Sequence, residues 1–425
     1  WPVRVFTAFE RLSKGLLFSC RMCGNCILQE TAFVCPMTCA KGMRNGPCGG
    51  ATPEHCEVEP SRACTWYMIY RRAERMGRLD RLLEVQAPLD GRRTGHETWL
   101  DLFHHWRRSE QRPRLTDSRA KFREDWSHLF YEVRQPDWWQ GDSAYHAPAY
   151  EAPASQLEAA LRAGHFVTTA EIAPPLGASP AQIERKVALL RDSVSAANLT
   201  DNASASARAN SLASSVVCLK AGLEPVLQLQ ARDRSRVMLQ ADAMGAATVG
   251  IRNVLCLTGD HHRFGLEPIS TPNQFDTDSV QILWILRRMR DQGRYVDGRT
   301  TAQRPIFFLG AAASPFSVPP RFDAIRIEKK INAGTQFIQT QPVFDYDRFV
   351  EWLEALDQRG LLDKVYILAG LTPLKSVAAA RFMANEVPGV VVPSEVVARM
   401  ERTGDGQAQQ EEGDEVGDHE STPAV

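Results

Sequence analysis

Thr169-Ala170-Glu171-Ile172-Ala173-Pro174-Pro175 reads as a short apolar strand that contains one carboxylate and stops at two prolines. Similar apolar runs recur downstream, and an amphipathic stretch follows each of the first seven. The runs that we predict to be strands are Phe166–Ile172, Ala196–Leu199, Pro225–Gln228, Asn253–Leu257, Ile306–Gly310, Phe337–Thr340, Val365–Ala369 and Val390–Val392. The predicted helices lie near Pro180–Arg191, Ser204–Ala221, Arg234–Ala243, Asp276–Asp291, Asp323–Ala333, Tyr346–Leu356 and Ser376–Ala384.

This alternation predicts an α/β protein whose main domain, residues 158–400, is a (β/α)8 TIM barrel. Eight strands alternate with helices over about 240 residues, which is the usual length of such a barrel. An open doubly wound sheet is the alternative. The chain has no GxGxxG turn after its first strand, which such sheets use to bind dinucleotides.

Polar side chains stand where several predicted strands end. Catalytic groups of a barrel lie at the carboxyl ends of its strands, because the loops there converge on one mouth. Glu171 ends the first strand, Asp260 follows the fourth, and Gln341 follows the sixth. A partly desolvated Glu171 would have a raised pKa and could act as a general acid. The alternatives are a carboxylate satisfied by an arginine or a backbone N–H, a turn cap for Asp260, and loop packing for Gln341.

The amino-terminal segment concentrates cysteines. Eight of the ten fall within 45 residues: Cys20, Cys23, Cys26, Cys35, Cys39, Cys48, Cys56 and Cys64. Thiolates gathered in a small polar segment are bonded to sulfur or to metal, and in a reducing compartment metal is favoured over disulfides. The CxxCxxC run and the Cys35-Pro36 pair are closer to [4Fe–4S] ligation than to a zinc ribbon with two separated CxxC pairs. Eight thiolates suffice for two such sites, zinc is the alternative, and spacing alone does not show which four share a site.

Length and charge set the remaining expectations. The chain has 425 residues, 44% of them hydrophobic, and a formal net charge of −1, which argues against nucleic-acid binding. No stretch is apolar enough to span a membrane, and no secretory signal is visible, so we expect a cytoplasmic protein. We divide it into a cysteine-rich domain (1–90), a wrapping linker (91–157), the barrel and a disordered acidic tail (401–425). Scattered tryptophans would anchor the linker to a neighbouring surface.

The barrel motifs resemble those of methylenetetrahydrofolate reductase. The resemblance rests on an ordered set of short motifs across residues 165–390, none of them specific alone. The motifs are Thr169–Pro175, Leu257-Thr258-Gly259-Asp260, Lys330-x2-Ala333-Gly334, Thr340-Gln341-Pro342-Val343-Phe344-Asp345 and Gly370-Leu371-Thr372-Pro373. It implies an FAD enzyme that reduces 5,10-methylenetetrahydrofolate to 5-methyltetrahydrofolate.

The resemblance also implies roles for individual residues. Glu171 would be the general acid that opens the folate ring, Asp260 would lie near flavin and folate, and Gln341 would bind the pterin. Asp323 and Lys330 would hold the ribose and phosphate of FAD. Thr200 and Gln228 would contact the flavin.

The amino-terminal motifs resemble a second protein, the cysteine-rich subunit that accompanies this reductase in acetogenic bacteria. The motifs are Cys20–Cys26, Cys35-Pro36 and Gly46-Pro47-Cys48-Gly49-Gly50. The resemblance implies a fusion in which electrons reach the flavin through two [4Fe–4S] clusters. The donor would be a ferredoxin-like protein or NAD(P)H, and we expect a homo-oligomer.

Two departures from the family pattern concern substrate and flavin contacts. Leu374-Lys375-Ser376-Val377 lacks the aromatic residue that stacks on substrate in bacterial reductases, and Gln228 stands where a histidine often contacts the flavin. Two other functions therefore remain open. One is a folate-binding methyltransferase or scaffold with structural zinc, and the other is an electron-transfer subunit without reductase activity.

Overall fold

A parallel seven-stranded sheet forms the centre of the computed structural model, which describes residues 2–95, 98–99, 143–265, 275–317, 319–387, 389–403 and 409–411. The strands pair in sequence order. They are β1 (Thr169–Ile172), β2 (Ala196–Leu199), β3 (Pro225–Gln230), β4 (Asn253–Leu257), β5 (Phe308–Ala313), β6 (Phe337–Pro342) and β7 (Tyr366–Gly370). Seven of the predicted strands are thus confirmed with small shifts at their ends.

The helices that accompany the strands are α6 (Gln156–Arg162), α7 (Ala181–Leu190), α8 (Ser211–Lys220), α9 (Arg236–Thr248), α10 (Ser279–Gln292), α11 (Pro320–Ala333), α12 (Tyr346–Asp357), α13 (Val377–Glu386) and α14 (Ser394–Arg402). Helices α7 to α13 follow the seven strands as the alternation predicts, whereas α6, before β1, and α14, after α13, were not predicted. Short 3-10 turns, η5 (Ala203–Ala205), η6 (His262–Phe264) and η7 (Leu362–Lys364), lie in the loops. Among the described residues no helix has the length and apolar content to cross a membrane.

The two faces of the sheet bury different sets of side chains, because successive strand residues point to opposite sides. Outward-facing residues such as Val254, Leu309 and Ile338 join the largest apolar cluster, formed with α9 to α12. Inward-facing residues near the amino ends of the strands, such as Phe308 and Phe337, form a separate cluster. The inner face is therefore apolar at its base, and its polar residues lie toward the carboxyl ends.

The eighth predicted strand is not a strand. Val390 and Val392 are buried beside α13 and α14, in a cluster that includes Leu374 and Met400. The run is too short to extend the sheet, and Pro393 directly after it has no N–H to donate. In the described residues β1 and β7 do not pair, so the sheet is curled but not closed as a (β/α)8 barrel would be.

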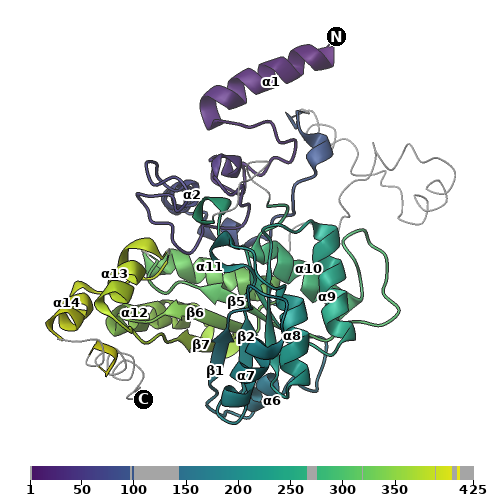
Figure 1. Ribbon diagram of the computed structural model, residues 1–425. Coiled ribbons are helices and arrows are strands. Elements are labelled where there is room, and N and C mark those ends of the chain that lie inside the picture. Colours follow the sequence, from purple (N-terminus) through teal and green to yellow (C-terminus); the bar gives the residue numbers. More distant parts are fainter. Residues whose placement is uncertain are drawn as a thin grey trace.

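The cysteine-rich segment covers the carboxyl-end edge of the sheet (Figure 1). It contains α1 (Pro2–Phe18), η1 (Pro36–Thr38), α2 (Thr65–Arg75), η2 (Leu79–Leu83) and η3 (Gly91–Arg93). Tyr70 of α2 stacks on Phe322 of α11, with ring centroids 5.1 Å apart. Backbone and side-chain groups of Arg44 and Asn45 bond to Asp278, the residue that caps α10. Because the amino ends of these helices follow strand carboxyl ends, the segment sits on the edge where we expect the site.

Two predictions concern parts of the chain outside the described residues. Of the tryptophans assigned to a wrapping linker, Trp106, Trp126, Trp138 and Trp139 lie there, whereas Trp99 is described and its ring contacts Phe6 and Phe9 of α1. Most of the acidic tail, residues 404–408 and 412–425, also lies outside.

Candidate functional site

Among the described residues, four polar side chains toward the carboxyl ends of the inner face each have a buried atom without a hydrogen-bond partner. The atoms are Asn198 Oδ1 and Thr200 Oγ1 of β2 and its loop, Gln230 Nε2 of β3, and Gln339 Oε1 of β6. Native proteins leave few such groups unpaired, because each costs about 1–3 kcal/mol. They gather toward the carboxyl ends of three strands on the inner side of the curled sheet, which makes this place the candidate site for a polar ligand.

Glu171 stands beside these groups on β1. It pairs in register with Asn198, and its side chain is exposed on the open edge of the sheet. Surrounding protein raises the pKa of Glu171 by desolvation, and a hydrogen bond with the Gln228 side chain partly opposes the rise. Solvent can therefore supply a proton to a carboxyl group whose neutral form is favoured. This is the setting that a general acid requires.

Asp260 orders the loop after β4. Its carboxylate accepts a hydrogen bond from the Ser204 N–H at 2.8 Å, and its carbonyl accepts one from Arg232 at 3.0 Å. Gly259 has φ +91°, and a Cβ there would lie 2.4 Å from Gln230 Oε1. The half-buried Asp260 thus joins the β2 and β4 loops. Its bond to the Ser204 N–H is of the turn-capping kind that the sequence analysis gave as the alternative role.

Thr200, Gln228 and Gln341 lie on the same inner face. Thr200 and Gln228 are buried. Gln341 is half-buried near the end of β6, next to a register irregularity between Gln339 and Pro342. Of these, Gln228 bonds to the Glu171 side chain, and Thr200 and Gln341 share the inner face with it.

Asp323 and Lys330 lie elsewhere, on α11 and inside the protein. The Asp323 carboxylate accepts a hydrogen bond from Trp352 Nε1 at 2.6 Å and forms an ion pair with Arg326. Lys330 Nζ donates to the Ala312 carbonyl at 2.5 Å, and burial lowers the Lys330 pKa to about 7. Both side chains already have protein partners, so neither offers a free group to a ribose or a phosphate.

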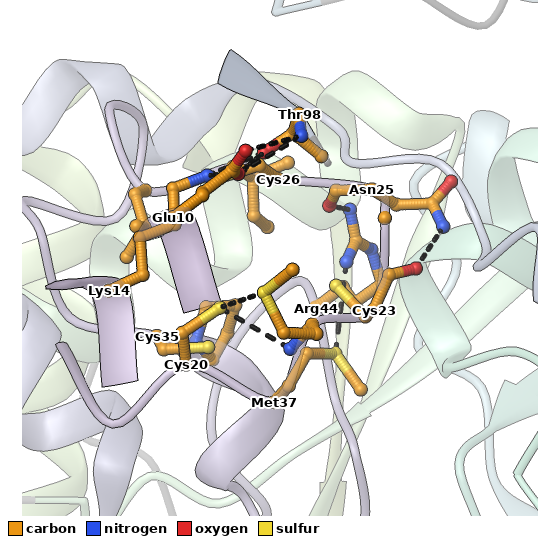
Figure 2. Close-up of a pocket in the computed structure, with 15 residues that line it drawn as sticks. Glu10, Lys14, Cys20, Cys23, Asn25, Cys26, Cys35, Met37, Arg44 and Thr98 are labelled. Carbon is orange, nitrogen blue, oxygen red and sulfur yellow. Dashed lines mark hydrogen bonds and ion pairs between the residues drawn. The ribbon is translucent and has the colours of Figure 1, made fainter. Parts of the chain in front are cut away.

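Four cysteines line one pocket beneath α1 (Figure 2). We call Cys20, Cys23, Cys26 and Cys35 the outer quartet, because Cys26 is exposed. A hydrogen bond between the Cys35 and Cys20 thiols lowers the pKa of Cys20 to about 6. Gly24 permits the tight CxxCxxC turn: its φ is +70°, and a Cβ there would lie 1.9 Å from the Arg93 carbonyl oxygen.

The other four amino-terminal cysteines form a second group, the inner quartet: Cys39, Cys48, Cys56 and Cys64. Each of Cys39, Cys48 and Cys64 lies near enough to another member for their charges to interact. Burial raises the pKa of these three thiols, to about 11 for Cys64. The carbonyl of Cys48 accepts a 3.4 Å hydrogen bond from Arg326 of α11, which joins the inner quartet to the sheet domain.

The structure therefore supplies the grouping that spacing could not. All ten cysteines are free thiols. Among the described residues no three His, Cys, Asp or Glu side chains are already arranged around a metal-sized point. Thiols are the donors that a thiophilic metal takes, and the two quartets are the places where such a group would be held. Cys218 and Cys256 lie apart, fully buried in the sheet domain, as core residues.

Sequence reasoning missed one binding candidate. Asn198 occupies the middle of a strand whose other residues are apolar, and a lone amide on the inner face was the available signal. Gln230 and Gln339 stood at strand ends, but nothing in their spacing showed that their amides lack partners.

Comparison with known families matches both parts of the chain. Residues 156–417 match the family described as methylenetetrahydrofolate reductase, and residues 3–92 match the one described as methylene-tetrahydrofolate reductase C terminal.

Two curated yeast proteins are similar to part of the chain. Methylenetetrahydrofolate reductase 1 of Schizosaccharomyces pombe is 27% identical over 158 residues, 36% of this chain and 23% of that protein. Methylenetetrahydrofolate reductase 2 of Saccharomyces cerevisiae is 26% identical over 166 residues, 37% of this chain and 25% of that protein. The match thus spans about a quarter of the length of these relatives.

Two solved structures align with the chain at low identity and low TM-score. An uncharacterized protein from Clostridium thermocellum that binds two copies of 5-methyl-5,6,7,8-tetrahydrofolic acid aligns with a TM-score of 0.44 and 13% identity, covering 62% of this chain and 86% of that one. Tryptophan synthase from M. tuberculosis aligns with a TM-score of 0.32 and 15% identity, over 60% of this chain and 94% of that one. The family match over residues 156–417 covers more than half of the sequence, and the chain belongs to the methylenetetrahydrofolate reductase family.

Proposed function

We propose that this protein reduces 5,10-methylenetetrahydrofolate to 5-methyltetrahydrofolate with a flavin, FAD, bound against the inner face of the sheet. The observation that carries the proposal is the group of unpaired buried polar atoms next to Glu171, the one carboxylate of β1. When bound, the flavin supplies the hydride.

The inner face fits the ring end of a flavin. Asn198, Thr200, Gln230 and Gln339 present buried donors and acceptors without partners, which suit the polar edge of an isoalloxazine. Gln228 adds a further amide at the same level. Asp323 and Lys330 do not fit the nucleotide end as they stand, because their charged groups are occupied within the protein. Contact of these two with FAD stays a prediction.

Glu171 would protonate the folate so that its five-membered ring opens to an electrophilic iminium. Its exposure allows reprotonation from solvent, and its raised pKa keeps a larger share of the acid protonated near neutral pH. Asp260 would stabilise the positive charge of the iminium from the β4 loop, held by its bond to Ser204. Gln341 would bind the pterin from the end of β6.

We further propose that electrons reach the flavin through iron–sulfur clusters in the two quartets. The support is positional: the outer quartet reaches the surface at Cys26, and the inner quartet lies at the edge of the sheet. The neighbouring β4 loop is bonded to the cysteine-rich segment, since Arg263 donates to the Val58 carbonyl. A ferredoxin-like protein or NAD(P)H would be the donor.

Anaerobic purification of the full chain tests the proposal. We expect flavin absorbance near ~450 nm with a broad iron–sulfur shoulder, iron and flavin by direct quantitation, and oxidation of methyltetrahydrofolate with an artificial acceptor. Zinc without iron would refute the electron route and favour a structural role for the quartets. Folate binding without flavin would favour a methyltransferase or scaffold, and flavin and iron without turnover an electron-transfer subunit.

A further inference from the structure

Each quartet has a buried lysine paired with a buried glutamate. Lys14 and Glu10 form an ion pair beside the outer quartet, and their side chains are 2% and 1% exposed. Lys41 and Glu57 form one beside the inner quartet, 2.5 Å apart and 4% and 6% exposed. Burying such a pair costs several kcal/mol of desolvation per ion, so a fold gains little stability from it. Two such pairs next to two thiol clusters call for another explanation.

Lys41 lies between the inner quartet and the catalytic loop. Its ammonium donates to the Gly259 carbonyl at 3.2 Å, one residue before Asp260. Its charge interacts with the Cys48 thiolate and with Asp260. Glu57, its partner, also accepts a hydrogen bond from the Gly50 N–H at 2.9 Å, two residues after Cys48. The Lys41–Glu57 pair therefore bonds both to the loop that carries Asp260 and to the backbone near Cys48, and electrons would pass between these two places.

Lys14 lies beside the outer quartet as Lys41 lies beside the inner quartet, but its hydrogen-bond partners are different residues. It lines the cavity of Cys20, Cys23, Cys26 and Cys35, and donates to Thr98 at 2.5 Å. Glu10 accepts from the Thr98 N–H at 3.0 Å. Figure 2 shows the charged ends of this pair meeting at Thr98, in the pocket that the four thiols line. Lys14 therefore provides a matched control for Lys41.

We infer that Lys41 is a positioning residue for electron transfer, which raises the reduction potential of a metal centre in the inner quartet while holding the Gly259-Asp260 turn against it. The inference rests on the proposed function, because it needs a redox metal in that quartet. Reduction adds one electron to the thiolate-bound centre, and the charge of Lys41 in a low-dielectric setting stabilises that added charge. Glu57 acts in the opposite sense.

Redox titration of the anaerobically purified full chain, followed by electron paramagnetic resonance, tests this. In Lys41→Met we expect one centre to shift to a more negative potential, with the reduced-to-oxidised ratio at fixed potential falling about tenfold. In Glu57→Gln the same centre shifts to a more positive potential. Lys41→Arg keeps the wild-type value, and Lys14→Met moves only the other centre. A role confined to packing would not give shifts of opposite sign.

The double variant Lys41→Met/Glu57→Gln keeps the test decisive if a single variant folds poorly, because it removes both buried charges. We expect its potential to lie between those of the single variants. Iron-loaded variants whose potentials do not separate in this order would overturn the role of Lys41 and leave the proposed function standing. A purified protein that contains zinc and no iron would overturn both, and metal analysis distinguishes the two failures.

Discussion

At the scale of single residues, Glu171 combines exposure with a raised pKa. The side chain reaches solvent on the open inner edge, yet desolvation by surrounding protein favours its neutral form. A strand-end carboxylate satisfied by an arginine would have a lowered pKa instead. The direction of the shift therefore supports the general-acid hypothesis over the structural one.

Glu171→Gln removes the proton donor while keeping the size of the side chain. We expect bound flavin to be retained and folate reduction to fall by about 10²–10⁴-fold, measured by single-turnover reduction of methylenetetrahydrofolate. Near-normal turnover would exclude the assigned role.

Asp260→Asn serves as the comparison, where we expect a slower folate step and a shifted flavin potential.

The pH profile of the folate half-reaction also tests whether Glu171 is the general acid. Because the Glu171 pKa is raised, its protonated form persists to higher pH than that of an ordinary glutamate, and the rate should fall as pH rises through that pKa. The Glu171→Gln variant should lose this limb of the profile. An identical limb in the variant would assign it to another group.

Thr200→Val tests the unpaired inner-face groups. The Thr200 hydroxyl is buried without a partner, so its removal should leave the thermal stability of the flavin-free protein unchanged or higher, while flavin affinity falls about 5–10-fold. Thr340→Val is the matched control: that hydroxyl accepts from the Gly370 N–H at 2.9 Å and donates to the Gln341 carbonyl at 2.8 Å, so its loss should destabilise the protein. Destabilisation by Thr200→Val would mean that the hydroxyl has a partner.

At the scale of elements, the sequence predicts the strands well, because buried strands are continuous apolar runs. β2 and β4 have the predicted bounds, whereas the predicted helix start at Ser204 moves to Ser211, since Asn202, Ser204 and Ala205 adopt positive φ in η5. Val390–Val392 shows the limit of the same rule. An apolar run is buried whether it forms a strand or a loop. Only the packing of Val390 and Val392 against α13 and α14 decides that this run is not a strand.

Asp278→Ala tests how α10 holds the cysteine-rich segment. Asp278 caps α10 through the Gln281 N–H at 3.0 Å and also accepts from the Arg44 N–H and the Asn45 amide. Its loss should lower the free energy of unfolding by about 3 kcal/mol or more, since it removes a helix cap and an acceptor for two buried N–H donors. Ser376→Ala, which removes the cap of α13 alone, should cost about 1 kcal/mol in the same chemical denaturation experiment. Equal losses would argue against the additional contacts.

At the scale of the whole molecule, the cysteine-rich segment and the sheet form one structure joined at the carboxyl-end edge. Phe322 and Ile325 of α11 belong to the same apolar cluster as Trp66 and Tyr70 of the segment. The inner quartet lies at this junction, since Cys39, Cys48 and Cys64 belong to or pack against that cluster, whereas the outer quartet reaches the surface at Cys26. A partner that delivers electrons would therefore meet the outer quartet first.

The grouping into quartets predicts the metal content of variants. Cys23→Ser and Cys56→Ser should each remove one site, about four of eight iron atoms per chain, and the double variant should lose both. Cys23→Ser combined with Cys35→Ser should lose no more iron than either alone, because both belong to the outer quartet. Iron analysis with optical spectra measures this, and loss of both sites in that same-quartet pair would refute the grouping.

Local patterns along the chain were sufficient to predict the seven strands of the sheet, their order, and the polar residue types at their ends. They are sufficient because burial and the alternation of side chains repeat along the chain. Three features of the described residues came only from the folded arrangement: the sheet is not closed, one amide atom each of Asn198, Gln230 and Gln339 has no partner, and the amino-terminal thiols lie in two neighbourhoods. Each depends on which distant segments meet, and spacing along the chain does not encode the distance between residues as far apart as Lys41 and Gly259.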